Sequence, residues 1–153
     1  MSYRISDRGE AFIKSFEKFR AKAYLDAVGI WTCGWGHTSK ISRYTTCTEQ
    51  TAEAWFKEDC APGEAYLNSL GVKLTQTQVD ALMSFIFNLG LARFKMSTLC
   101  KLVKHSAPAD MVAREFRKWV YGTDRRTGKK TKLGGLVKRR DAEANLYQFG
   151  RYE

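Results

Sequence analysis

The chain has 153 residues, of which 44% are hydrophobic, and a formal net charge of +10. A chain of this length buries about two thirds of the surface of its unfolded state, so we expect residues 1–153 to form a single domain. No stretch holds the ~18 apolar residues of a membrane span, and the N-terminus lacks the roughly 7–15 of a secretion signal, which excludes stable membrane insertion.

The positive charge is concentrated in the C-terminal part of the chain, and such a surface favours a polyanionic partner. Nucleic acid and the carboxylate- and phosphate-bearing bacterial envelope both fit this charge, and a basic face that is merely solvated is a third interpretation. Charge alone does not decide among the three. The basic residues are Arg114, Arg117, Lys118, Arg125, Arg126, Lys129, Lys130, Lys132, Lys138, Arg139 and Arg140.

Four cysteines, Cys33, Cys47, Cys60 and Cys100, lack the Cys-x-x-Cys or Cys/His spacing of a zinc site. We therefore expect neither a metal nor another cofactor. A chain without an export signal starts in a reducing compartment, so we expect free, buried thiols. Cys33 and Cys47 could nevertheless meet across the small sheet described below.

The first predicted helix runs from Ser6 to about Lys18. Its apolar residues recur at intervals of three and four, as on the buried face of an amphipathic helix. These residues are Ala11, Phe12, Ile13, Phe16 and Phe19. Glu17 then falls in the last turn, where the negative end of the helix dipole favours its protonated form.

Residues 25–38, after Tyr24, are rich in β-branched and aromatic residues and contain several glycines, a composition typical of strands. The segment Asp26-Ala27-Val28-Gly29 has Asp first and Gly last, as type I turns prefer. It is predicted to join two strands of a small sheet. Asp26 would then lie at a fixed corner of that sheet.

Helices are predicted for most of the remaining chain. Thr48 is a candidate N-cap for a helix that continues to Leu70, and Pro62-Gly63 could kink it. From Leu74 onward two apolar stripes follow a helical period, and stripes of this kind are usually core. Their members are Val79, Leu82, Met83, Ile86 and Phe87, and then Met111, Val112, Phe116, Trp119 and Val120.

Residues 121–130 are predicted to form a loop or a short hairpin. A final helix should begin near Leu136 and run to Tyr147. One helix, a small sheet and then further helices together predict an α+β fold.

Glu17, Asp26 and Thr32 form a candidate catalytic set. Hydrolysis of a glycosidic bond uses two carboxyl groups in unlike environments, one giving a proton to the leaving oxygen and the other stabilising or directing the attack. Phe16 and Phe19 around Glu17 favour a neutral acid, whereas turn donors favour an ionised Asp26. The Thr32 hydroxyl and Asp26 can together hold one water. Taken singly, each residue equally fits a helix charge, a turn former or a strand residue.

Three blocks of sequence carry a resemblance to a known family. The first block is Glu17, Asp26, Thr32 and Gly34-Trp35-Gly36-His37-Thr38. The second is residues 74–90, followed by Phe94 and Ser97-Thr98-Leu99, and the third is residues 135–143. In order and spacing, over most of residues 10–147, the chain resembles the phage lysozymes, or endolysins, of glycoside hydrolase family twenty-four.

The resemblance implies a two-lobed lysozyme-like fold with substrate in the cleft between the lobes. The small, sheet-containing N-terminal lobe would span about residues 14–47 and the connecting helix about 48–70. The helical C-terminal lobe would span about 71–153, with the N-terminal helix packed near it.

The resemblance also implies hydrolysis of the β-1,4 bond between N-acetylmuramic acid and N-acetylglucosamine in bacterial peptidoglycan. Glu17 would protonate the leaving oxygen, and Asp26 with Thr32 would direct water to the opposite face of the sugar ring, with inversion. Since an inverting enzyme leaves room for that water, we expect the Glu17 and Asp26 carboxyls to lie roughly 6.5–9.5 Å apart.

Sugar contacts along the cleft are expected from Thr38, Phe87, Asn88 and Ser97, on the same resemblance. Phe87 and Ser97 equally fit packing and helix-capping roles, because apolar residues at helical spacing are usually core.

The resemblance further predicts that His37 pairs with Asp59 on the connecting helix and ties the sheet to it. A general-base role for His37 is disfavoured, because the two-carboxylate mechanism has no step left for it. Either Arg139 or Arg140 is expected to approach Glu17, with the other on the surface.

The sequence departs from the family pattern at Trp31 and Trp35, where aliphatic or smaller residues are more common, and we expect the indoles to repack the small lobe or to widen its apolar contacts. Unlike some members, the chain is expected to lack an N-terminal anchor, and it has no cysteine at position 26. Redox control of the catalytic set is therefore not expected.

The expected partners are peptidoglycan glycan strands and the anionic envelope surface, with no nucleic acid, and the expected state is a monomer. The chain would accumulate in the host bacterial cytoplasm and act on the wall from the periplasm after release by a separate holin-type protein. One rival interpretation is a nucleic-acid-binding module, whose affinity would fall steeply with salt. Another is an inactive lysozyme domain that only binds the wall.

Overall fold

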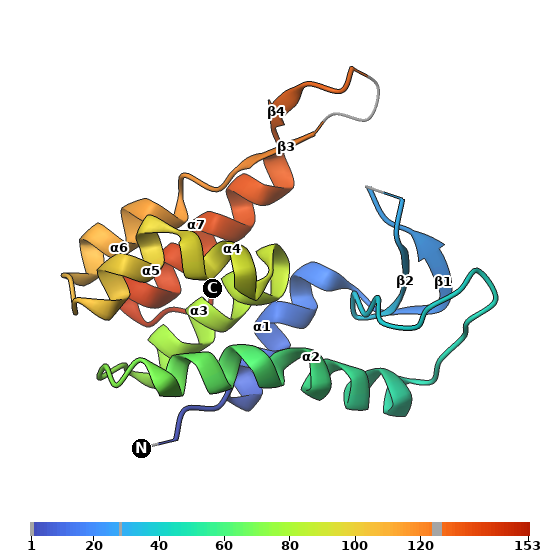
Figure 1. The fold of residues 1–153 in the computed structure, drawn as a ribbon, viewed down its shortest axis with the longest axis horizontal. Coiled ribbons are helices and arrows are strands. Elements are labelled where there is room, and N and C mark those ends of the chain that lie inside the picture. Colours follow the sequence, from blue (N-terminus) through green and yellow to red (C-terminus); the bar gives the residue numbers. More distant parts are fainter. Residues whose placement is uncertain (1, 28, 124–126) are drawn as a thin grey trace.

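The computed structural model describes residues 2–27, 29–123 and 127–153. These residues form seven helices and two separate two-stranded sheets. Figure 1 shows the first sheet and the segment after it standing to one side of the helices, with the long helix α2 (Glu49–Ser69) running between the two regions. The predicted α+β, two-lobed fold is confirmed, while the lobe boundaries themselves stay a prediction.

Helix α1 (Asp7–Glu17) begins and ends where the sequence predicts. The Ser6 hydroxyl accepts a hydrogen bond from the Gly9 backbone N–H at 3.0 Å, which satisfies one of the free donors at the helix start. The helix ends because Lys18 adopts a positive φ of 52°. Glu17 is therefore the last helical residue, and its side chain projects from the end of α1.

The small sheet consists of β1 (Arg20–Leu25) and β2 (Trp31–Gly34), paired antiparallel with Tyr24 opposite Thr32. The expectation that strand structure starts only after Tyr24 is wrong, because β1 already begins at Arg20. The predicted turn between the strands has its closing hydrogen bond, in which the Gly29 N–H donates to the Asp26 carbonyl at 3.1 Å. Val28, within this turn, lies outside the described residues.

Helix α2 is capped as predicted, with the Thr48 hydroxyl accepting from the Thr51 N–H at 3.1 Å. Pro62 lies inside the helix. Helix α3 (Gln76–Leu89) follows, and it is the most buried helix described: the run from Val79 to Ile86 is buried throughout. α3 therefore forms the centre of the helical region, against which α1, α2 and α7 (Gly134–Phe149) pack.

Three short helices complete the helical region, α4 (Leu91–Met96), α5 (Thr98–Lys104) and α6 (Ala109–Phe116). The predicted stripe from Met111 to Val120 is partly wrong. α6 ends at Phe116, so Trp119 and Val120 follow the helix, although Val120 is still buried. Met111 is exposed, because α6 turns Val112, Ala113 and Phe116 toward the core instead.

The segment after α6 forms the predicted hairpin, from β3 (Tyr121–Thr123) and β4 (Lys130–Lys132). Figure 1 shows this hairpin projecting from the start of α7. Arg125 and Arg126 of the basic run lie outside the described residues. α7 begins two residues earlier than Leu136, at Gly134.

The four cysteines are free thiols, and three of them are buried. Cys33 and Cys47 do meet at the small sheet, with their sulfur atoms 3.5 Å apart. Burial, together with the contact to Cys33, raises the pKa of the Cys47 thiol to about 11. No helix among the described residues is long and apolar enough to cross a membrane.

Candidate active site

Glu17 lies at the junction of three segments that are distant in sequence. Its side chain is 18% exposed and accepts a hydrogen bond at Oε2 from Arg139 Nη1 of α7, at 2.5 Å. On the small-lobe side Gly36 lies so close that a Cβ atom there would be 3.0 Å from Glu17 Oε1. The carboxyl is thus held between the guanidinium of one lobe and the backbone of the other.

Asp26 and Thr32 are brought together by a single backbone residue, Ile30. The Ile30 N–H donates to Asp26 Oδ1 at 2.9 Å, and the Thr32 hydroxyl donates to the Ile30 carbonyl at 2.9 Å. The Asp26 N–H in turn donates to the Ile30 carbonyl at 3.0 Å. A hydroxyl and a carboxylate oxygen can both accept hydrogen bonds, so Thr32 and Asp26 are of the residue types that can bind a water molecule.

Tyr24 of β1 lies within electrostatic range of both carboxylates. Burial raises the pKa of the Tyr24 hydroxyl, and the negative charges of Glu17 and then of Asp26 raise it further, against the opposing charge of Arg20. Such charge effects act over short distances. Both carboxylates therefore act on a common residue, while the separation of roughly 6.5–9.5 Å between the Glu17 and Asp26 carboxyls stays a prediction.

Two hollows meet near Glu17. One, of about 790 Å³, lies between the end of α1, the end of α3 and the start of α7. Its lining includes Glu17, Asn88 and Arg139, with the lysines Lys18 and Lys138 adding positive charge.

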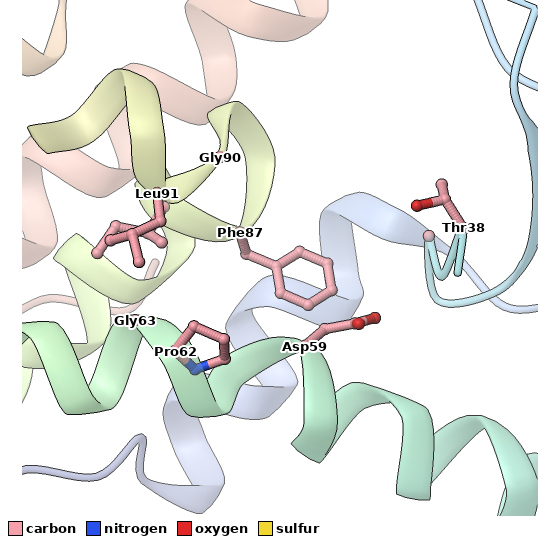
Figure 2. Close-up of a pocket in the computed structure, with 9 residues that line it drawn as sticks. Thr38, Asp59, Pro62, Gly63, Phe87, Gly90 and Leu91 are labelled. Carbon is pink, nitrogen blue, oxygen red and sulfur yellow. The ribbon is translucent and has the colours of Figure 1, made fainter. Parts of the chain in front are cut away.

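The other hollow, of about 290 Å³, includes Gly36, Thr38, Asp59 and Phe87 in its lining. Figure 2 shows the Phe87 ring pointing into the space between Asp59 on α2 and Thr38. Because Gly36 is adjacent to Glu17, the two hollows adjoin at the candidate acid.

His37 is nearly buried and contacts α2 in two ways. Its Nδ1 lies 2.9 Å from Asp59 Oδ2, and its ring stacks on Trp55 with centroids 4.6 Å apart. The predicted His37–Asp59 contact is therefore present. Burial raises the pKa of the Asp59 carboxyl, and the contact with His37 opposes that shift.

The remaining predicted contacts separate into two groups. Thr38, Phe87 and Asn88 line the hollows beside Glu17. Ser97 is buried and its hydroxyl is engaged, donating to the Phe94 carbonyl at 2.6 Å and accepting from the Cys100 N–H at 3.0 Å. The structure gives Ser97 the capping role that the sequence analysis held open, at the start of α5.

The expectation that the second arginine of the pair lies on the surface is wrong. Arg139 is the residue that contacts Glu17, and Arg140 is completely buried, where Nη2 donates to the Asn88 amide oxygen. The Arg140 Nε lies 3.0 Å from Glu143 Oε1. This buried carboxylate pairs with Arg140 in the interior, and no local sequence pattern indicates the pairing.

Trp35 contributes to the junction between the small sheet and α1. Its ring lies 5.1 Å from the Phe19 ring and 4.1 Å from Lys14 Nζ. The sequence analysis places Trp35 in the first family block and notes it as a departure from the family pattern. It does not identify Tyr24, Gly36 and Glu143 as neighbours of the site. Gly36 belongs to the Gly34-Trp35-Gly36-His37 motif of the first family block, and this motif is the sequence signal by which Gly36 could have been identified.

No cluster of three or more His, Cys, Asp or Glu that could hold a metal ion occurs within the described ranges.

Comparison with known proteins gives consistent matches. Residues 14–143 match the family described as phage lysozyme. An endolysin of Acyrthosiphon pisum secondary endosymbiont phage 1 is 41% identical over 145 residues, covering 94% of this chain and 97% of that protein. The solved structure of the endolysin from Escherichia coli O157:H7 phage FAHEc1 aligns with a TM-score of 0.88 at 29% identity, covering 100% of this chain and 98% of that one.

The muramidase domain of SpmX from Asticaccaulis excentricus aligns with a TM-score of 0.85 at 32% identity, covering 95% of this chain and 97% of that one. The fold and these matches define a glycoside hydrolase of the lysozyme class. The chain belongs to the phage lysozyme family, and it is an endolysin in type.

Proposed function

We propose that this chain hydrolyses the β-1,4 bond between N-acetylmuramic acid and N-acetylglucosamine in peptidoglycan, with Glu17 as the general acid. The observation that carries the proposal is the position of Glu17, between the two lobes and in the wall of a 790 Å³ hollow. Because 18% of the Glu17 side chain is exposed, a sugar can reach the carboxyl.

Asp26 and Thr32 hold the attacking water in this proposal. Their common link through Ile30 fixes a carboxylate and a hydroxyl side by side at the sheet corner. A carboxylate that accepts a proton from water, next to a hydroxyl that accepts its second hydrogen bond, is suited to general-base catalysis. We expect Glu17 and this water to act from opposite faces of the sugar ring, which predicts inversion, and an assay of the anomeric configuration of the first product tests this. Net retention would contradict the inverting part.

Sugar rings are proposed to lie along the two adjoining hollows. Phe87 offers an apolar face, while Thr38 and Asn88 offer hydrogen-bonding groups on either side of Glu17. Ser97 was proposed with them, and its engaged hydroxyl favours an indirect effect through the position of α5. The basic surface is proposed to increase binding to the anionic envelope.

The decisive experiment is Glu17→Gln in a turbidity assay on Gram-negative cells whose outer membrane has been permeabilised. We expect kcat to fall by roughly 10²–10⁴-fold, because Gln cannot give a proton to the leaving oxygen. Glu49→Gln, an exposed substitution in the first turn of α2, is the matched control and should keep full activity. A fully active Glu17→Gln enzyme would remove Glu17 from the mechanism.

The same assay separates the rival interpretations. A domain that only binds the wall would sediment with peptidoglycan and clear no cells even as wild type. The monomeric state, the periplasmic site of action and release by a holin-type protein stay predictions, and expression with and without a membrane-permeabilising partner tests the last of these.

A further inference from the structure

A buried cluster of charged side chains lies behind Glu17, on the side away from the sheet. It consists of Arg139, Arg140 and Glu143 of α7 with Ser84 of α3, and we call it the α7 cluster. Arg140, Glu143 and Ser84 have no exposed surface, and Arg139 is 4% exposed. Charges are rarely buried to this extent unless they are paired.

The guanidinium of Arg139 is fixed from three directions. Nη1 donates to Glu17 Oε2 at 2.5 Å, Nε donates to Glu143 Oε2 at 3.3 Å, and Nη2 donates to the Ser84 carbonyl at 3.2 Å. Ser84 Oγ donates to the same Glu143 oxygen at 2.5 Å. Glu143 therefore sets the orientation of the group that contacts the candidate acid.

We propose that Glu143 is a positioning residue for the hydrolytic reaction: it orients Arg139 and balances the positive charge of α7, so that Glu17 can hold its catalytic proton. This inference rests on the proposed function of Glu17. Glu143 itself is fully buried behind Arg139, so its effect is transmitted through that residue.

The charge balance gives the direction of the effect. Two guanidiniums face two carboxyl groups, since Arg140 Nε lies 3.0 Å from Glu143 Oε1 and Arg139 contacts both Glu143 and Glu17. If Glu143 lost its charge, the guanidiniums would have only Glu17 to neutralise them. A more positive surrounding favours the ionised form of a carboxyl group, and an ionised Glu17 cannot act as an acid.

Other titratable groups around Glu17 also contribute to the charge that its carboxyl experiences. Lys18 follows it in the chain and Lys138 of α7 lines the same hollow, so both add to the positive charge. Tyr24 of β1 is neutral over the working range of pH, because burial and the two carboxylates raise its pKa. Glu143 does not line the hollow, but from its buried place behind Arg139 it opposes the charge of these cations.

The stability of the fold does not by itself explain this cluster. Burial raises the pKa of the Glu143 carboxyl, while Arg140, Arg139 and the Ser84 hydroxyl oppose that shift. Replacing a buried ion pair by apolar residues is often neutral or stabilising, so a cluster of this kind is weak evidence for a stabilising role. Its direct contact with Glu17 through Arg139 indicates a role in the reaction instead.

The test compares the pH dependence of kcat in wild type, Glu143→Gln and Glu143→Asp. In Glu143→Gln we expect the alkaline limb of the kcat profile to move to lower pH by about one unit. The reason is that the negative charge of Glu143, which reaches Glu17 through Arg139, is lost. KM should stay within about twofold, since substrate does not touch Glu143. Glu143→Asp keeps the charge and should return the limb toward the wild-type position.

Asp80→Asn is the matched control, because Asp80 is an equally buried carboxylate on α3 that bonds to Ser6, Gln76 and Tyr152, away from Glu17. It should lower stability without moving the limb. Ser84→Ala provides a second route if Glu143→Gln does not fold. It keeps all charges and removes the hydroxyl that holds Glu143, so kcat should fall several-fold at unchanged KM.

An unmoved alkaline limb in Glu143→Gln, or an equal shift in Asp80→Asn, would overturn the proposal. If Glu143→Gln does not fold, a wild-type kcat in Ser84→Ala would also overturn the proposal. These failures are distinct from that of the proposed function, because Glu17→Gln would still be inactive.

Discussion

Replacement of Gly36 by alanine should damage catalysis more than its effect on stability explains. Gly36 has a φ of 79°, in the left-handed region, where an L-residue costs roughly 1–2 kcal/mol. Its new Cβ atom would lie 3.0 Å from Glu17 Oε1 and 3.8 Å from Phe87 Cε1. Because Arg139 restrains the carboxyl from the other side, the side chain of Glu17 has to shift along the cleft.

The size of the expected effect follows from how steeply catalysis depends on position. A misplacement of about 1 Å can cost about 100-fold, so a shift of a few tenths of an ångström should lower kcat roughly 3–10-fold. The strain alone should lower Tm by roughly 2–8 °C in a domain of this size. The variant should therefore remain folded at 25 °C with impaired turnover.

Gly71→Ala is the matched control for Gly36→Ala. Gly71 has a φ of 65°, and a Cβ atom there meets nothing within 4 Å. It should show a similar loss of Tm by circular dichroism and a wild-type kcat in the turbidity assay at 25 °C. If the two variants lose equal activity, the close approach of Gly36 to Glu17 does not affect kcat, and the reasoning is refuted.

Two further predictions concern stability. In Gly9→Ala the Cβ atom would lie 2.4 Å from the buried Asp80 Cγ, so we expect roughly 2–4 kcal/mol lost in urea unfolding. In Gly63→Ala the Cβ atom would lie 3.2 Å from the side chains of Met83 and Ile86, and the variant should stay within about 1 kcal/mol of wild type; equal losses would contradict this reasoning. Burial raises the pKa of the Cys60 thiol to about 12. Since the unfolded thiol ionises first, near pH 9, wild type should lose about 1 kcal/mol between pH 8 and 10 that Cys60→Ala does not lose. Parallel pH curves would refute this.

The helices were predictable because their signals are local. Ser6, Thr48 and Thr75 each stand at the start of an apolar period, and each caps a helix in the structure. Strand β1 was not predictable from its composition, because Arg20-Ala21-Lys22-Ala23 lacks strand-forming residues. Pairing on both sides makes it a strand: Tyr24 faces β2, and the Ala23 N–H donates to the Thr45 carbonyl at 2.9 Å. Such long-range pairing overrides propensity.

The candidate site shows the same division between local and distant information. Asp26 and Thr32 lie in one hairpin, so their spacing in sequence nearly determines their geometry. The choice between Arg139 and Arg140 could not be made from sequence, because neighbouring positions on a helix point about 100° apart and the facing element decides. Both proved to be buried, since Glu143 is close enough to pair with each.

The two parts of the site should respond differently to changes in helix packing. The Asp26–Thr32 arrangement depends on Ile30 within the β1–β2 hairpin and therefore tolerates changes in helix packing. The position of Glu17 depends on α7 through a contact spanning 122 residues and on Gly36 from the sheet side. Substitutions that loosen α7 against α3 should accordingly impair the proposed proton donation by Glu17 while the Asp26–Thr32 arrangement stays formed. Substrates with a better leaving group need less proton donation, so they should recover activity in such variants but not in Asp26 variants.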